Sequence, residues 1–444
     1  MLNSASVMGR YTLTGTVKLT SPLVIRAGVS NDILNDTVDD IVVTYHDGQP
    51  FIPGTSLAGV LRQAIQGLEP VSEDVLFGSI DDKGTQSALQ INDIPLDNTN
   101  IVVRDGIRID DVRGVTEDGA KYDFEVIESG ATGRLRIDCV IRQCHENQVD
   151  KIERALVALA NLLKNGISIG ARTMNGLGRV TCKDISLEYY DFTKPEHVKA
   201  WLLRKAGTSV AIPERCMISE KDLVIDMECC LEDTLLIKSI FEEAWEDKSV
   251  ALFIPGTSIK GVLRHHCSRI LQALGRSNQA VDTLFGYSIE KTNESRKGRV
   301  MVDEVYFDKS FTQEEQPRIR MDRFTGGAMN GALFQDHPVR KGKGKQLAFP
   351  LRITVKDCSD SEAGLVLLLV KDLMTGQITL GANRTIGYGR IKGNAVTVQY
   401  HGESYGIDGT GKVTVSESTK LEALVQALHQ STEDTMLAKE GAHE

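Results

Sequence analysis

The sequence predicts an α+β protein in which one domain fold occurs twice in tandem. The phrase FIPGTSLAGVLRQAI begins at Phe51, and FIPGTSIKGVLRHHC begins at Phe253, 202 residues later. Three further blocks recur in the same order: VLFGSI with TLFGYSI, IRIDDV with IRMDRF, and GARTMNGLGR with GANRTIGYGR. A length of 444 residues suits two domains of roughly 200 residues each. Four blocks in one order indicate a duplicated domain.

Each copy contains the same succession of expected elements. Alternating and β-branched residues predict opening strands over 9–25 and 221–237. Apolar residues at helical spacing predict helices after each IPGTS phrase, over 57–68 and 259–274, with Thr or Ser to cap the first turn. Further strands are expected over 88–96, 133–141, 299–307 and 347–355, and second helices over 148–166 and 362–376. A closing strand after each glycine-rich loop completes the split βαβ order of a ferredoxin-like domain.

These elements predict four segments along the chain. The first domain covers 1–205 and the second covers 219–410, with a Gly-, Pro- and Ser-containing linker over 206–218. The remaining residues, 411–444, are expected to form an amphipathic helix with a polar tail, appended to the second core rather than part of it.

Composition limits the classes of function. A net charge of −10 argues against a protein that coats nucleic acid non-specifically, although a local basic groove is compatible with it. No run of about 20 apolar residues and no signal peptide is present, so we expect a cytoplasmic protein with no membrane partner. Eight cysteines without a C-x-x-C pair disfavour a disulfide framework or a zinc ribbon.

Two kinds of local sequence are suited to phosphate. The loops GARTMNGLGR and GANRTIGYGR combine glycines with Arg or Asn, so that backbone N–H groups and cations could meet a phosphate; a plain turn before a strand is the alternative. The IPGTS phrase places Ser56 and Ser258 at a helix start, where anions bind readily, although an ordinary helix cap is equally compatible. Basic residues lie on the turns that follow: Arg62, Lys260 and Arg264.

Few residues are suited to catalysis. His265, His266 and Cys267 could be metal ligands, but no second ligand cluster accompanies them, and a helix-surface pair beside a buried cysteine explains them as well. Asp39 and Asp40 precede a β-branched hairpin, where a solvated loop is the simple interpretation.

The repeated motifs together resemble the RAMP superfamily of CRISPR–Cas proteins, and within it the backbone subunits of type III effector complexes. The resemblance covers nearly the whole chain twice, and the fusion of two copies is most similar to type III-D-like effectors. It implies a modified ferredoxin-like (RRM-like) palm in each copy, with an inserted β-hairpin thumb. It also implies guide RNA, complementary target RNA and other effector subunits as partners in antiviral defence.

The resemblance implies a role for specific residues. Guide phosphates would contact Ser56, Arg62, Arg172, Asn175, Arg179, Ser258, Lys260, Arg264, Asn383, Arg384 and Arg390. The thumbs, which interrupt the guide–target duplex, would contain Ile109, Asp110, Val112, Met321, Arg323 and Phe324.

Asp39 matches the position of the aspartate that cuts target RNA in catalytic members, in a reaction that depends on Mg²⁺ or another divalent cation and on no organic cofactor. The metal ligands are unknown at this stage. The second copy has Phe241, Glu242 and Glu243 across the same stretch, so we expect one cut per chain, beside the first copy.

Three other functions stay open. The chain could be a non-catalytic guide-RNA scaffold with Asp39 in a solvated loop. It could be a guide-processing endoribonuclease, for which only His265 and His266 offer a general acid–base near a first helix. It could also be a duplicated enzyme that binds a phosphate ligand in its glycine-rich loops.

Overall fold

The computed structural model divides the chain into two compact units. Unit 1 comprises Met1–Thr173 and Leu177–Met217, and unit 2 comprises Met174–Gly176 and Ile218–Glu444. The structure describes residues 6–27, 40–66, 73–79, 84–107, 109, 119–214, 219–246, 252–289, 294–307, 311–340, 347–409 and 415–430.

Unit 1 contains a large antiparallel sheet and a separate hairpin. Its strands are β1 (Val7–Leu19), β2 (Phe51–Ile52), β3 (Leu89–Ile91), β4 (Ile94–Asp97), β5 (Ile101–Gly106), β6 (Tyr122–Ile127), β7 (Thr132–Arg142), β8 (Ile167–Ser168), β9 (Arg179–Asp191) and β10 (Thr208–Val210). Its helices are α1 (Gly54–Ile65), α2 (Glu73–Phe77), α3 (Val149–Asn165) and α4 (Pro195–Leu202), with the 3₁₀ turn η1 (Gln143–Gln148). Since β10 pairs with β9, part of the segment expected to be a linker belongs to this sheet.

Unit 2 repeats the plan. Its strands are β11 (Leu223–Leu231), β12 (Thr234–Leu235), β13 (Phe253–Ile254), β14 (Gly286–Ile289), β15 (Glu294–Lys297), β16 (Val300–Val302), β17 (Val305–Tyr306), β18 (Thr312–Gln313), β19 (Gln316–Met321), β20 (Ala328–Asp336), β21 (Val339–Arg340), β22 (Leu347–Val355), β23 (Ile391–Tyr400) and β24 (Glu403–Asp408). Its helices are α5 (Lys238–Glu246), α6 (Gly256–Ala273), α7 (Gln279–Phe285), α8 (Asp360–Met374) and α9 (Val415–Gln430), with the 3₁₀ turn η3 (Arg384–Ile386).

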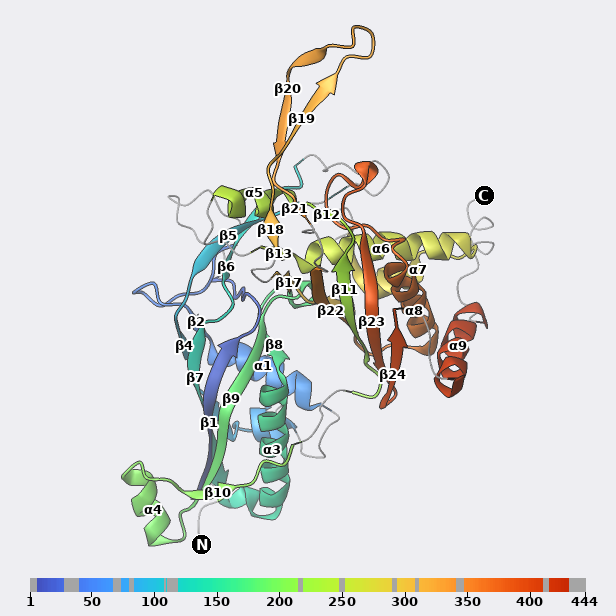
Figure 1. Cartoon of the computed structure of the whole chain (residues 1–444). Helices are drawn as coiled ribbons and strands as arrows, with labels where there is room; N and C mark the ends of the chain where they lie inside the picture. Colours follow the sequence, from blue (N-terminus) through green and yellow to red (C-terminus); the bar gives the residue numbers. More distant parts are fainter. Residues whose placement is uncertain are drawn as a thin grey trace. The chain divides into compact units, whose positions relative to one another are not determined.

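The two sheets share the strand order of a ferredoxin-like domain. Numbering the four principal strands of each unit in chain order, the order across the sheet is 4-1-3-2: β9-β1-β7-β3 in unit 1 and β23-β11-β22-β16 in unit 2 (Figure 1). The predicted fold is therefore confirmed in both copies.

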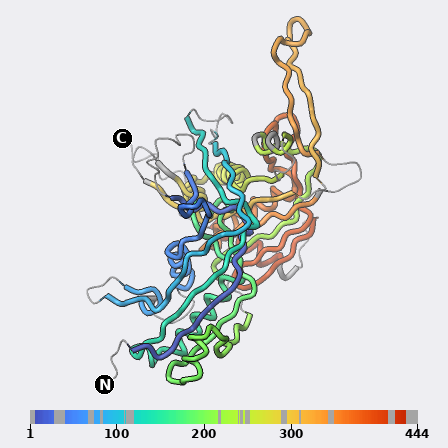
Figure 2. Tube along the Cα trace, turned by 90° about the vertical axis from the view of Figure 1, so that its left-hand side faces the viewer, coloured from blue at the N-terminus to red at the C-terminus, as the bar shows by residue number. Residues whose placement is uncertain are grey.

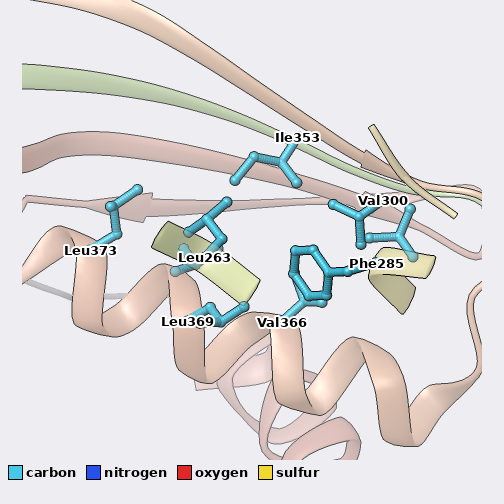
Figure 3. A pocket seen from close by; sticks show the side chains of 9 residues that line it. Leu263, Phe285, Val300, Ile353, Val366, Leu369 and Leu373 are labelled. Atoms are coloured by element: carbon cyan, nitrogen blue, oxygen red, sulfur yellow. The ribbon is translucent and has the colours of Figure 1, made fainter. Parts of the chain in front are cut away.

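One face of each sheet is covered by helices. In β1 the apolar side chains of Tyr11 and Leu13 are buried on this face, and Tyr11 donates from its hydroxyl to Glu153 of α3 (2.8 Å). In unit 2, side chains of α6, α8 and the sheet meet around a small void lined only by apolar groups, including Leu263, Ile353 and Leu369 (Figure 3). Because no polar group lines that void, it belongs to the core rather than to a ligand site.

Each unit carries a hairpin outside its main sheet, at matching chain positions. The β5–β6 pairing includes Ile101 opposite Ile127 and Gly106 opposite Tyr122. Adding 212 to each number gives Gln313 opposite Val339 and Arg318 opposite Phe334, which are pairings of β18–β21 and β19–β20. The second hairpin, β19–β20, extends away from the sheet of its own unit (Figures 1 and 2). The hairpins at the two predicted thumbs therefore pair corresponding residues with each other.

Two local expectations were wrong. The helices after IPGTS begin at Gly54 and Gly256 with a proline at the N-cap and no side-chain cap hydrogen bond, so neither Thr nor Ser caps them. Helix α9 is not an appendage, because Leu421 and Leu428 are buried in the core of unit 2. A β-carbon on Gly364 of α8 would lie 2.2 Å from the carbonyl oxygen of Leu424, so the two helices pack backbone to backbone.

No helix in the described part of the chain is both long and apolar enough to span a bilayer.

Candidate nucleic-acid interface

The first glycine of each glycine-rich loop, Gly170 or Gly381, packs closely against backbone of its own unit. Gly170 and Gly381 have φ values of +87° and +76°, and a β-carbon on either would lie within 2.3 Å of a backbone carbonyl oxygen, that of Val24 or Leu236. A side chain cannot be accommodated there. These glycines therefore allow each loop to pack closely against the segment that contains Val24 or Leu236, and their presence needs no bound phosphate.

The residue two positions after each of these glycines is left-handed. Arg172 has φ +58° and Asn383 has φ +59°. Arg172 therefore corresponds to Asn383, and Arg384 corresponds to Thr173, so the two loops do not share an arginine at this point. The arginine common to both is the one that follows the last glycine, Arg179 or Arg390.

Arg172 is enclosed by the base of the first thumb. Its guanidinium carbon lies 4.3 Å from the ring centre of Phe124 and 4.6 Å from that of Tyr122. One terminal nitrogen donates to the Tyr122 hydroxyl (3.0 Å), and the other donates to a carboxylate oxygen of Asp40 (3.2 Å). Both charged side chains are only 18% exposed. Arg172 is thus engaged within unit 1 rather than pointing to solvent.

Asp40 has a second cationic partner and backbone contacts as well. Arg26 lies 3.0 Å from the same carboxylate oxygen. The carbonyl of Asp40 accepts from the N–H of Glu125 in β6 (2.8 Å), and the Glu125 carboxylate accepts from the N–H of Val42 (3.0 Å). The segment that begins at Asp40 is therefore attached to thumb strand β6.

Unit 2 makes a related connection, in which the cation comes from the thumb and the aromatic ring comes from the glycine-rich loop. Here the cation is on the thumb, where the Arg318 guanidinium carbon lies 4.6 Å from the ring centre of Tyr388 in the glycine-rich loop. Asn383 donates to the carboxylate of Asp336 (3.0 Å), the thumb residue that corresponds to Phe124. Arg318 also donates to the Tyr388 hydroxyl. Both units thus fasten thumb to loop, but with different residue types.

The helix starts of the IPGTS phrases differ from a free anion site. In unit 1 the first helical N–H, that of Gly54, donates to the carboxylate of Asp93 (2.7 Å). Ser56 is the third residue of α1, and the equivalent Ser258 donates its N–H to the carbonyl of Pro255 (3.0 Å). An acidic side chain therefore already satisfies part of the positive end of α1.

Arg62 and Arg264 each bridge to the following short helix. Arg62 lies 3.7 Å from Asp74 before the LFG sequence, and Arg264 lies 2.9 Å from Asp282 at the equivalent place. Their side chains remain 42% and 35% exposed, so a phosphate could still reach them. Their contact with RNA stays a prediction.

Lys260 lies one turn before Arg264 and is half-buried. Burial, and then the neighbouring cations Arg264 and Lys297, lower the pKa of the Lys260 ammonium to about 8. A phosphate beside these three cations would relieve their mutual repulsion, which makes this cluster a plausible anion-binding surface.

The exposed basic residues of the second glycine-rich loop are Arg384 and Arg390. Arg384 opens η3 and faces solvent. Arg390 is 65% exposed and lies 3.6 Å from Glu232, a weak surface pair. Asn175 ends the short turn η2 (Thr173–Asn175), and Arg179 opens β9. Of the predicted loop residues, Arg384 and Arg390 are the most accessible to a phosphate backbone.

A basic strip on the sheet of unit 1 was missed by sequence reasoning. On the face of the sheet opposite α3, β1 places Thr16 directly between Arg134 of β7 and Lys183 of β9. Lys18 and Arg136 lie two residues along the same face, and all four cations are exposed. Arg136 also forms an ion pair with Asp138 (2.9 Å). The alternation in TVKL and GRLRI was the available signal. In unit 2 the positions of Lys18, Arg134 and Lys183 are taken by the uncharged residues Cys230, Pro350 and Ala395. The position of Arg136 is taken by Arg352, which pairs with Asp226.

The predicted thumb residues are placed in part. Ile109 is 48% exposed, and Met321 and Phe324 are 50% and 99% exposed. Arg323 is exposed beside Phe324, in a tip where the Asp322 carboxylate accepts from the N–H groups of Phe324 and Thr325 (both 2.8 Å). Asp110 and Val112 lie outside the described residues, as does the predicted catalytic residue Asp39.

The described residues do not form a pre-built metal centre. Among them no group of three or more His, Cys, Asp or Glu side chains could hold a metal ion. His266 lies 2.8 Å from Asp372, where it links α6 to α8, and Cys267 is buried in the core. The carboxylate of Asp40 faces two guanidinium groups, a surrounding that suits a cation poorly.

Comparison with known families agrees with the internal repeat. The family model described as the RAMP superfamily matches residues 16–181 and again residues 239–392. No curated protein matches the chain. The two matched regions together cover more than half of the chain. The first contains α1, α3, β3, β7 and the β5–β6 hairpin, and the second contains α6, α8, β16, β22 and the β19–β20 hairpin. The chain therefore belongs to the RAMP superfamily of CRISPR-associated RNA-binding proteins, with one RAMP domain in each of its two units.

Proposed function

We propose that this protein is a backbone subunit of a type III CRISPR effector, in which the two palms bind consecutive parts of one guide RNA. The observation that carries the proposal is the duplicated thumb and loop geometry, with pairings of one register 212 residues apart. A guide is a row of nearly equivalent phosphates, so tandem copies of one binding unit match it. Fusion makes the second binding event intramolecular.

The guide-binding surface is proposed to use exposed and partly exposed cations of both units. Arg384, Arg390 and the cluster around Lys260 serve in unit 2, and the basic strip of unit 1 (Lys18, Arg134, Arg136, Lys183) serves in unit 1. These side chains offer charge without sequence preference, which is what a subunit holding variable guides requires. The exposed apolar groups of the second thumb, such as Phe324, are suited to unstacking bases.

We further propose that target RNA complementary to the guide is cut beside unit 1, with Asp39 as the catalytic residue. The ribose 2′-OH attacks the neighbouring phosphate at a nucleotide that the thumb has displaced, and a carboxylate can orient or deprotonate that hydroxyl. The bond from phosphorus to the 5′-oxygen of the next nucleotide breaks, which leaves a 2′,3′-cyclic phosphate and, once that oxygen takes up a proton, a 5′-hydroxyl. The support is the difference between the copies: only unit 1 carries an aspartate pair before its hairpin, and the carbonyl of Asp40 accepts a hydrogen bond from Glu125 of thumb strand β6.

Dependence on a divalent cation is part of the proposal, although the described residues do not fit a resident metal site. Mg²⁺ is commonly held by one or two carboxylates together with substrate phosphates, so the ion could arrive with the RNA. EDTA is expected to stop the cut without releasing the guide.

The test uses the assembled complex, labelled complementary RNA and a sequencing gel. Asp39→Ala should abolish one cut per chain while guide content and target affinity stay unchanged. Asp40→Asn is run in parallel, because Asp40 is the nearest residue that could be the catalytic aspartate instead. Two cuts per chain in the wild type, or a surviving cut in Asp39→Ala, would overturn the assignment.

A non-catalytic scaffold is the second candidate, and one observation favours it. Asp40, the carboxylate of the aspartate pair that the structure describes, is neutralised by Arg26 and Arg172 rather than free. Complexes that bind target RNA but leave it whole would select this alternative.

A further inference from the structure

Strand β5 of the first thumb has an edge without a neighbouring strand. In the part of the chain that the structure describes, β5 pairs with β6 alone, in a separate two-stranded sheet. In an antiparallel pair, every second residue of a strand directs its N–H and C=O groups away from the partner strand. Such backbone groups on an edge strand are a template for another strand unless proline, charge or a bulge protects them.

The outward side chains of β5 are apolar. Ile101 and Val103 alternate along the strand and are 38% and 48% exposed. Ile107 and Ile109 continue at the same two-residue spacing and are 54% and 48% exposed. We call these four side chains the outer row. The other face of β5 is covered within unit 1, because Val102 packs against a small core cluster. The outer row has the spacing at which an added strand places its own side chains.

The charge beside the outer row is negative. Asp105 of β5 lies directly across from Asp123 of β6, an arrangement in which like charges repel. The Lys121 ammonium lies 3.2 Å from the Asp105 carboxylate and 3.6 Å from that of Asp123, so two carboxylates and one ammonium leave one negative charge. A phosphate backbone is repelled by this charge, and aliphatic side chains offer no ring on which a base can stack. A lysine or arginine of a protein partner is attracted.

The second thumb differs at the matching positions, 212 residues later. Val103 corresponds to Glu315, so a charge replaces an apolar side chain. Asp105 corresponds to Pro317, and a proline protects an edge strand because it has no N–H group to donate. Strand β19 also carries the exposed cation Arg320, which favours RNA. Of the two described hairpins, the first is therefore the one suited to a protein strand.

We propose that the edge of β5 binds another protein subunit of the effector complex, which adds an extended segment as a further strand. The segment has apolar side chains beside the outer row and a lysine or arginine facing Asp105 and Asp123. Main-chain hydrogen bonds give the affinity, and the alternate side chains give the specificity. The inference goes beyond the proposed function, which concerns RNA, and it leaves the displacement of a nucleotide by the thumb unchanged.

The experiment measures amide hydrogen exchange at single-residue resolution in three samples: the chain alone, the chain with a synthetic guide RNA, and the complex purified with its other subunits. In the complex, the outward N–H groups of β5 should exchange about tenfold more slowly or slower still, and with guide RNA alone the change should be less than about twofold. The affected amides should alternate along Ile101–Gly106, because those between them already bond to β6. Protection by guide RNA alone, or an unprotected edge in the complex, would overturn the inference.

Two variants at Val103 test the edge itself. Val103→Lys adds a charge of the kind that protects natural edge strands, so exchange of β5 in the complex should return to within about twofold of that in the chain alone. Val103→Thr keeps a β-branched side chain and should lose part of the protection, while unchanged exchange of β6 shows that the hairpin is folded. Glu315→Lys is the matched control in unit 2 and should leave the protection as it is. Wild-type protection in both Val103 variants would exclude the edge as the binding surface.

The remaining outcomes identify other occupants and separate the two proposals. Protection that grows with the concentration of the chain alone would identify a second copy as the occupant and refute the assignment to another subunit. If the edge stays exposed in a complex that retains guide RNA and cuts target RNA, this inference is wrong and the proposed function stands. If the chain joins no effector complex, both fail.

Discussion

Arg318 and Tyr388 form a cation–π contact in unit 2, with the guanidinium carbon 4.6 Å from the ring centre. Arg318 belongs to thumb strand β19, and Tyr388, which is 7% exposed, belongs to the glycine-rich loop. The Tyr388 hydroxyl also donates to Gln316 of the same strand. The base of the thumb is therefore held by a loop that lies about 70 residues further along the chain.

We predict that Tyr388→Leu loosens the second thumb. A partly buried cation–π contact contributes about 1–2 kcal/mol, so amide hydrogens of β19 and β20 should exchange roughly tenfold faster. Tyr388→Phe keeps the ring and removes only the hydroxyl, so it should have a smaller effect. Equal exchange in the wild type and Tyr388→Leu would show that the contact does not restrain the thumb.

The basic strip of unit 1 predicts a salt-dependent effect on RNA binding. Reversing two charges, with Arg134→Glu and Lys183→Glu, should weaken guide binding and reduce the slope of log K against log salt by about one for each lost phosphate contact. Reversal at Arg352 is unsuitable as a control because its guanidinium donates two hydrogen bonds to the Asp226 carboxylate (2.6 and 2.7 Å). Lys221→Glu is suitable, because the Lys221 side chain is 75% exposed and its pair with Asp357 is a 4.0 Å surface contact of little energy, and it should leave the slope unchanged. Wild-type affinity and slope in the Arg134/Lys183 variant would exclude the strip from the RNA surface.

Lys260 predicts a pH dependence of guide binding. Its pKa is lowered to about 8, and a bound phosphate would raise it again, so binding takes up a proton above pH 8. Affinity should be constant below about pH 7 and fall up to about tenfold between pH 8 and 9 at fixed salt. Lys260→Arg remains charged and should remove this dependence. A pH profile that is the same for the two proteins would place Lys260 outside the interface.

Phe324 at the tip of the second thumb is 99% exposed, so its removal should not affect folding. If the thumb displaces target bases, Phe324→Ala should lower the chemical reactivity of nucleotides beside unit 2, because an aromatic face is lost for stacking. Arg323→Ala tests charge at the neighbouring position. Deletion of Gly326–Asn330 shortens the same tip and should act in the same direction. Identical reactivity in all variants would contradict a wedge function.

Local rules in the sequence were sufficient for the repeat, the element order and the hairpins. Helical spacing after IPGTS, the glycine after α3, and alternation in the strands depend on residues close in the chain. Gly166 ends α3 with φ +99° as expected. The place of the second thumb followed from the resemblance to the RAMP superfamily together with the matching of the two copies.

Contacts between distant residues were decided only by the tertiary structure. The Asp93 carboxylate bonds to the first N–H of α1 from 39 residues away, which is why no Ser or Thr cap was needed. The alternation of Lys18, Arg134 and Lys183 became a single strip only when strand pairing placed them on the uncovered face. Arg172 and Arg384 have similar surroundings in sequence, but one is enclosed on aromatic rings beside Asp40 and the other is exposed. The sequence by itself determined that the chain is built from two copies of one α+β fold, because the periodicity of each element is local and the repeated phrases can be matched directly. Which charges face RNA and which face each other was decided by the tertiary structure, because an ion pair depends on distance in space and on the burial of both partners.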